Sequence, residues 1–137
     1  MGLYDVFSIS GSAMSAQSVR LNTVASNLAN ADSVGATPEE AYHARQPVFA
    51  AVLSVLNGEQ QSVGVKVAGI VESEAEIPRD YQPNHPMADA DGYVYKANVN
   101  SVEEMANMIS ASRSYQNNVE VLNTSKQLLL KTLSLGR

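Results

Sequence analysis

The sequence of 137 residues predicts a mainly α-helical protein with a small β insert. Antiparallel N- and C-terminal coiled-coil helices are expected to flank a central module rich in β-hairpins. Three observations predict this fold class: a seven-residue repeat near each end, and between them a stretch of β-branched residues and prolines without such a repeat. We therefore divide the chain into an N-terminal coiled-coil helix over residues 1–36, a central β-rich insert with a Pro-rich loop over residues 37–97, and a C-terminal coiled-coil helix over residues 98–137.

The first segment has the period of a helix from residue 4 to residue 31, and residues 31–35 resemble a helix stop. Steps of four and three keep a seam on one side of a helix, because their mean of 3.5 nearly matches a helical turn. The seam consists of Leu3, Phe7, Ser10, Met14, Gln17, Leu21, Val24, Leu28 and Ala31.

The surface of this helix is almost free of charge. From Ser8 to Ser33, 18 of 26 residues are Ser, Ala, Asn, Gly, Thr or Asp, and Arg20 and Asp32 are the only charged residues. Uncharged polar side chains can be buried once they are hydrogen-bonded, so the composition suits a helix that is packed on several sides. The same composition is typical of a segment that is frayed or disordered in an isolated monomer and becomes ordered on assembly.

The central segment has the signals of a β-hairpin or a small sheet. The period of the apolar run at residues 48–56 does not separate helix from strand, but the Asn57-Gly58 turn signal follows it. Residues 63–71 alternate with β-branched side chains and are followed by three glutamates that resemble a solvated strand edge. Three prolines in residues 77–92 predict an irregular loop, and residues 93–95 predict a short strand.

The second helix is expected over residues 102–134, a rod of about 50 Å. Asn100 or Ser101 can cap it, and Glu103 and Glu104 lie in its first turn, where the helix dipole favours acids. Steps of three and four give its seam: Met105, Met108, Ser112, Tyr115, Val119, Leu122, Lys126, Leu129 and Leu133. Its outward positions are again mostly uncharged and polar.

Charge and composition exclude several classes of partner. The net charge is −5, and the acids concentrate in residues 37–97, which hold four basic and nine acidic residues. No basic run is present, so we expect no nucleic acid partner. We also expect no direct membrane insertion, no lipid anchor and no cleaved secretory signal peptide. The absence of cysteine excludes disulfides and thiolate metal sites.

No catalytic residue, metal site or cofactor is expected. His43 and His85 lie far apart in the sequence, and no cysteine accompanies them. Residues 89–92 resemble part of a calcium loop, but Met87 and Asn98 occupy the positions where that loop needs Asp and Glu. No phosphate-binding loop, nucleophile elbow or dinucleotide fingerprint occurs.

Two sequence signatures resemble those of the axial proteins of the bacterial flagellum, the rod, hook and hook-associated subunits. Residues 25–32, Ala-Ser-Asn-Leu-Ala-Asn-Ala-Asp, resemble the N-terminal signature of that family. The paired C-terminal signature is represented by Asn98-Val99-Asn100, Glu104, Met108-Ile109, Arg113, Tyr115 and Asn118. The short length and the segments at residues 44–49 and 85–89 make the chain most similar to the proximal rod members. The resemblance covers nearly the whole chain.

The resemblance implies a non-enzymatic structural subunit that assembles itself through its terminal helices into the axial drive shaft of the basal body. In this family the terminal helices form the inner layer of a helical tube, and the β insert lies outside it. The implied partners are copies of the chain, other flagellar rod proteins and the flagellar type III export apparatus. Export is expected without a cleaved signal, followed by polymerisation in the periplasm.

The expected assembly interface combines seam positions with residues that match the family signatures. It consists of Leu3, Phe7, Met14, Leu21, Asn22, Val24, Asn27, Leu28, Asn30, Met105, Met108, Arg113, Tyr115, Asn118, Val119, Leu122, Leu129 and Leu133. Asparagine amides can bridge groups between packed helices, and an arginine can hold a carboxylate or carbonyl at a subunit contact.

Two other functions compete with the structural one. A helical hairpin also suits an adaptor or chaperone of the flagellar export system. A hydrolase or metal enzyme that uses His85 and Asp89 is the third hypothesis.

Overall fold

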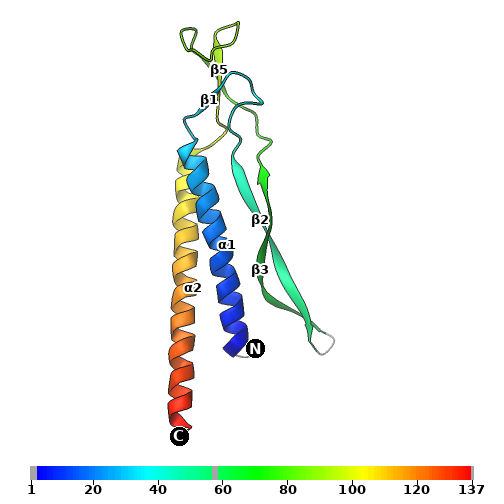
Figure 1. Cartoon of the computed structure of the whole chain (residues 1–137), viewed down its shortest axis with the longest axis vertical. Helices are drawn as coiled ribbons and strands as arrows, with labels where there is room; N and C mark the ends of the chain where they lie inside the picture. The colour runs from blue at the N-terminus through cyan, green and yellow to red at the C-terminus, as the bar shows by residue number, and fades with distance from the viewer. Residues whose placement is uncertain (1–2, 57–58, 137) are drawn as a thin grey trace.

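The computed structural model describes residues 3–56 and 59–136, with side chains for residues 4–53 and 64–136. Two long helices and two small antiparallel sheets make up this part of the chain. Helix α1 spans Leu3–Ala29 and helix α2 spans Ser101–Leu135. The helices lie side by side and run in opposite directions, and the longer α2 extends beyond the start of α1 (Figure 1). The prediction of a mainly helical protein with a β part is confirmed.

Polar side chains close the facing ends of the two helices. Asn100 caps α2, because its side chain accepts hydrogen bonds from the backbone N–H groups of Val102 and Glu103. At the other end of the connection, Asn30 donates to the carbonyl of Ser26 in the last turn of α1, at 2.8 Å. Both contacts satisfy backbone groups that a helix terminus leaves without a partner.

The apolar run that the period left undecided is a strand. Strand β2, Arg45–Leu56, pairs antiparallel with strand β3, Glu59–Glu72, and the register shifts between Val48 and Phe49 and between Val52 and Leu53. The predicted turn at Asn57-Gly58 lies outside the described residues. We call the described parts of β2 and β3 the arm.

A second sheet lies at the far end of the molecule from the two chain termini (Figure 1). Its strand order is β1 (Val34–Gly35), β5 (Tyr93–Lys96), β4 (Arg79–Tyr81). Only β5 was predicted from the sequence. The segments of β1 and β4 were assigned to a helix stop and an irregular loop, because two or three residues carry no measurable period.

Helix α1 is the central element, since it packs against α2 on one side and against the arm on another. Among the side chains that the structure describes, the buried apolar residues are few and mostly small: Ala16, Val24, Ala41, Ala44, Val94, Ala97 and Ala111. A helix with two packed faces accounts for part of the uncharged composition of α1. Neither described helix combines the length and hydropathy that crossing a bilayer requires.

The face of α2 that meets α1 differs from the predicted seam at alternate positions. Glu104, Ala111 and Ser125 are the buried residues of α2, whereas Met105 and Lys126 are exposed. The seam positions Met108, Ser112, Tyr115, Val119, Leu122 and Leu129 are half-buried, and each of the three buried residues lies one position before a seam residue. Small side chains let two helices approach closely. With small residues such as Ala111 and Ser125 at the contact between the helices, larger side chains of α2 remain exposed.

Candidate assembly interface

Asn27 ties three elements together, and we call its surroundings the joint. The residue is fully buried in α1. Its Oδ1 accepts from the backbone N–H of Arg45 at 2.9 Å and from the Tyr42 hydroxyl at 3.0 Å. Its Nδ2 donates to the Arg45 carbonyl at 2.8 Å and to Oε2 of Glu104 in α2 at 2.9 Å. Two donors and two acceptor positions are all that an asparagine amide offers, so its capacity is fully used.

The joint continues along the contact between the helices. Asn107 donates to Oε1 of Glu104 at 3.3 Å, and its Oδ1 accepts from the guanidinium of Arg20 in α1 at 3.1 Å. An amide therefore links a cation on one helix to a carboxylate on the other. Within the described residues, the ion pairs are Arg45 with Glu72 and Lys96 with Asp80, so Arg20 and Glu104 interact through Asn107.

A second asparagine holds the root of the arm. Asn98 accepts from the backbone N–H of Ala44 and donates to the carbonyl of Ala75 at 2.9 Å. Beside it, the backbone N–H of Ser73 donates to the carbonyl of Ala44 at 2.7 Å. Asn27 and Asn98 thus bind backbone groups at the start of β2 and just after β3. The arm is fixed to the helix pair at this end by hydrogen bonds to its main chain.

The four asparagines of the predicted interface, Asn22, Asn27, Asn30 and Asn118, have different contacts in the structure. Only Asn27 bridges elements, and it does so within one molecule. Asn30 and Asn118 each donate at 2.8 Å to a carbonyl of their own helix. Asn22 is exposed. The roles of Glu104 and Asn107 in the joint, and of Asn98 at the root of the arm, were missed. Glu104 and Asn98 belong to the C-terminal signature, and that signature is the sequence feature that could have identified them as functional residues.

The predicted interface residues do not form a single surface. Val24 and Asn27 are buried inside the chain, and the side chain of Leu3 lies outside the described ones. The exposed members are Asn22, Met105, Arg113 and Leu133. The half-buried members are Phe7, Met14, Leu21, Leu28, Asn30, Met108, Tyr115, Asn118, Val119, Leu122 and Leu129. Part of the set closes α1 against α2, and part faces outward.

The outward surfaces of the two helices carry few charges. On α1 the exposed positions recur in steps of four and three and form what we call the outer stripe: Tyr4, Ser8, Gly11, Ser15, Ser18, Asn22, Ala25 and Ala29. On α2 the exposed large apolar residues are Val102, Met105, Ile109, Val121, Leu128, Leu130, Leu133 and Leu135. Arg113 is exposed and has neither an ion pair nor a hydrogen bond to another described residue. These surfaces suit contact with protein and lack reactive groups.

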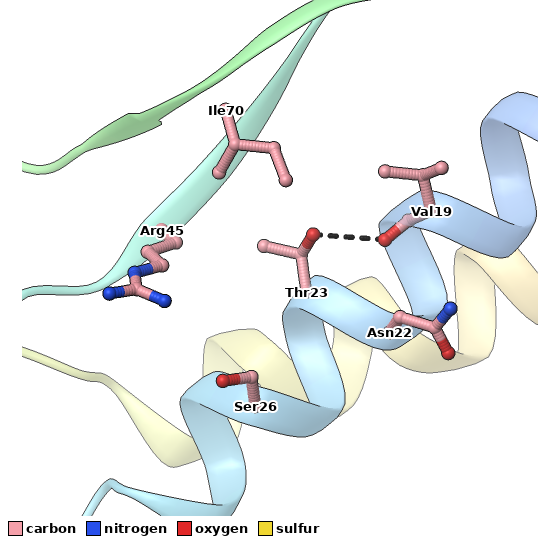
Figure 2. Close-up of a pocket in the computed structure, with 6 residues that line it drawn as sticks. All are labelled: Val19, Asn22, Thr23, Ser26, Arg45 and Ile70. Atoms are coloured by element: carbon pink, nitrogen blue, oxygen red, sulfur yellow. Dashed lines mark hydrogen bonds between the residues drawn. The ribbon is translucent and has the colours of Figure 1, made fainter.

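A groove of about 340 Å³ lies between α1 and the arm (Figure 2). Ile70 points from β3 toward Val19 and Thr23, and the Thr23 hydroxyl donates to the Val19 carbonyl at 2.9 Å. Asn22, Ser26 and Arg45 complete the lining. The one charged side chain of the groove, Arg45, is paired with Glu72 at 3.3 Å. The groove therefore presents hydroxyls and aliphatic carbons, without a nucleophile and base in contact.

The residues of the enzyme hypothesis have local structural contacts. Asp89 accepts from the backbone N–H groups of Asp91 and Tyr93, at 3.0 and 2.8 Å, and from the Tyr95 hydroxyl at 3.2 Å. The Tyr93 N–H bond is the main reason that the pKa of Asp89 lies below its ordinary value. His85 accepts from the backbone N–H of Met87 at 3.1 Å. In the described part of the chain, no three His, Cys, Asp or Glu residues gather in a way that could hold a metal ion.

Comparison with known proteins places the chain among flagellar rod components. Residues 7–37 match the family model described as flagella basal body rod protein, and residues 90–135 match that of the flagellar basal body rod FlgEFG protein C-terminal. The flagellar basal-body rod protein FlgC of Salmonella typhimurium is 53% identical over 137 residues, which is 100% of both chains. The protein of the same name from Escherichia coli O157:H7 is 53% identical over the same extent. That of Buchnera aphidicola subsp. Schizaphis graminum is 45% identical over 139 residues, with 99% of each chain covered.

Proposed function

This chain belongs to the family of flagellar basal-body rod proteins, and we propose that it is built into the rod through the outward surfaces of α1 and α2. It is a structural subunit of the basal-body rod. The observation that carries this conclusion is the identity of 53% to rod proteins along the entire chain. None of the relatives reported above is named an adaptor, a chaperone or an enzyme, so the two competing hypotheses gain no support.

Exposed apolar residues on α2 support assembly through the helices. Eight large apolar side chains of α2 are exposed, among them Ile109 at 56% and Leu133 at 62%. Exposed large apolar side chains of this kind support a contact site, because covering them removes apolar area from water. The partners that we infer are copies of this chain and other rod proteins.

The outer stripe of α1 supports the same proposal. Its central positions are Ser, Gly, Asn and Ala, which allow the close approach of a second helix and leave no charge to be buried. Among the predicted interface residues, Asn22, Met105, Arg113 and Leu133 point outward and are the ones that we assign to subunit contacts. Arg113 offers five N–H donors and is assigned to a carboxylate or a helix-terminal carbonyl of a neighbour.

We further infer the arrangement of the segments in the rod. Residues 1–36 and 98–137 form an inner layer of coiled-coil helices, and residues 37–97 lie outside it. The thin alanine-rich core supports a chain that is marginally stable alone and is stabilised by its neighbours. Such a chain also suits passage through the flagellar export apparatus in an unfolded state, without a cleaved signal, before it assembles in the periplasm.

Charge substitution on α2 tests the proposed assembly surface. We expect Ile109→Glu to keep the helical content and unfolding midpoint of the free chain, because Ile109 is exposed, and to abolish rod formation by placing an unpaired carboxylate in a subunit contact. Circular dichroism, and electron microscopy of basal bodies from cells that express the variant, measure the two effects. Val24 is unsuitable for this test, since its side chain is 4% exposed and closes the helix pair itself.

Val71→Glu is the matched control on the arm, where Val71 is 50% exposed. We expect this variant to keep rod formation. Rods containing Ile109→Glu at the wild-type level, in cells that swim normally, would show that this surface of α2 is not a subunit contact.

A further inference from the structure

The arm touches α1 at a second place, far from its root. The Ser12 hydroxyl donates to the Ile9 carbonyl of its own helix at 2.8 Å, which fixes the orientation of the side chain. The same oxygen accepts from the backbone N–H of Val65 in β3 at 3.1 Å. A helix side chain thereby satisfies a strand N–H that faces away from the paired strand β2, and part of the outer edge of β3 is covered.

The close approach depends on a glycine next to Val65. A Cβ atom added at Gly64 would lie 2.6 Å from Ser12 Oγ and 3.3 Å from Ser12 Cβ, and the first distance is too short for any side chain. Gly64 pairs with Val52, directly beside a register shift of the hairpin. Such a bulge strengthens the local twist of a strand pair, which turns the edge of β3 toward the helix.

The root and the Ser12 contact are well separated along α1. Ser12 lies fifteen residues before Asn27 in the same helix, or about 22 Å along its axis. Between them, Ile70 approaches Val19 and Thr23 while remaining 52% exposed, so the apolar contact is partial. The arm is hydrogen-bonded to α1 at two separate places, near Asn27 and at Ser12. Together these two contacts fix the orientation of the arm relative to α1.

We propose that Ser12 and Gly64 are a positioning pair that fixes the free part of the arm against α1. Without the contact, the arm is fastened at its root and pivots there. The consequence for assembly rests on the proposed function: the pair sets where the exposed part of the arm near Lys66 lies relative to the outward surfaces of α1 and α2 in the rod.

Amide hydrogen exchange in the free full-length chain tests the hydrogen bond itself. We expect Ser12→Ala to accelerate exchange of the Val65 amide by about tenfold, the value of one hydrogen bond. Ser15→Ala is the matched control, because Ser15 is an exposed serine of the same helix. Unchanged exchange of Val65 in Ser12→Ala would overturn the proposal.

A distance between two spin labels tests the position of the arm. The chain has no cysteine, so Ser18→Cys on α1 and Lys66→Cys on β3, both at exposed positions, carry the labels. Gly64→Ala is expected to shift this distance to larger values. Gly69→Ala adds the same methyl group to β3, where no atom lies within 4 Å, and is expected to leave the distance unchanged.

The double variant Ser12→Gly/Gly64→Ala separates the contact from backbone strain, since Gly64 also has a φ of 158°. This variant lacks both the clash and the Ser12 hydrogen bond, so we expect a broad distribution of distances like that of Ser12→Ala, in place of the discrete shift of Gly64→Ala. A wild-type distance in Gly64→Ala, or a discrete shift that persists in the double variant, would overturn the proposal. These measurements use the free chain, so they stand or fail independently of rod formation.

Discussion

At the residue scale, one asparagine decides how the parts of this protein meet. The sequence identified Asn27 through a family signature as a residue of the assembly interface, and in the structure its amide bridges packed elements of a single chain. Which elements it bridges was not predictable, because a seven-residue repeat defines a face of a helix without identifying what covers it. In the structure, Asn27 of α1 is covered by β2 and α2 of the same chain. Tyr42 and Glu104 complete the contacts.

The Asn27→Asp variant tests the joint. The substitution removes two donated hydrogen bonds and places a second carboxylate where Nδ2 lies 2.9 Å from Oε2 of Glu104. We expect a loss of about 3 kcal/mol in the free energy of unfolding at pH 7, from unsatisfied buried groups and like-charge repulsion. Urea denaturation measures this change.

The pH dependence of that variant has a definite sign. Two adjacent carboxylates share a proton in the folded state more readily than in the unfolded state. We therefore compare the free energy of unfolding of Asn27→Asp with that of Asn27→Ala at the same pH. The difference is expected to favour Asn27→Asp more at pH 4 than at pH 7. Asn22→Ala, at an exposed asparagine of the same helix, is the control and should change the free energy of unfolding by less than about 0.5 kcal/mol. An Asn27→Asp variant as stable as this control would contradict the assigned role of the joint.

At the element scale, the sequence predicted the long elements and, of the short strands, only β5. A regular period over most of their 27 and 35 residues defines the two helices, and the alternating β-branched residues define β3. The strands β1 and β4 form only because β5 lies between them. The offset seam of α2 has a related cause: Ala111 is small and Ser125 is polar, so a search for large apolar positions passes over them, yet both are buried.

The sheet β1-β5-β4 is expected to loosen in acid. Asp89 orders the turn before β5, and the backbone N–H of Tyr93 is the first reason that its folded-state pKa lies below the ordinary value of 3.8. A lowered pKa in the folded state means stability that is present above pH 3.8 and is lost as the pH falls through the folded value. Asp80 contributes with the same sign, because Lys96 is the main cause of its lowered pKa.

NMR titration of the Asp89 carboxyl carbon measures this effect. We expect its midpoint below 3.8 in the wild-type chain and a shift toward that value in Tyr93→Pro, which lacks the N–H donor. Tyr95→Phe removes the weaker hydroxyl contact and should move the midpoint less, since that contact ranks behind the Tyr93 bond. A wild-type midpoint at or above 3.8 would contradict the contacts that we assign to this turn.

At the scale of the whole molecule, α1 packs against α2 on one side and the arm on another, while its outer stripe and apolar residues of α2 remain exposed. The fold class and the segregation of acids into the central segment were predicted from the sequence. The direction of the arm was not, because it depends on single polar contacts at Asn27, Asn98 and Ser12 that no periodicity records. An alanine-rich core and exposed leucines together support the proposal that neighbouring subunits stabilise this chain.

The central claim is that subunit contacts cover the outer stripe of α1 and the exposed apolar residues of α2 in the rod. Maleimide labelling of Ser15→Cys and Ile109→Cys, in a chain that has no other cysteine, tests it most directly. Both positions are exposed in the single chain. We expect rapid labelling of the free chain and protection of both cysteines in purified basal bodies. Equal labelling rates in the free chain and in intact rods would contradict the account.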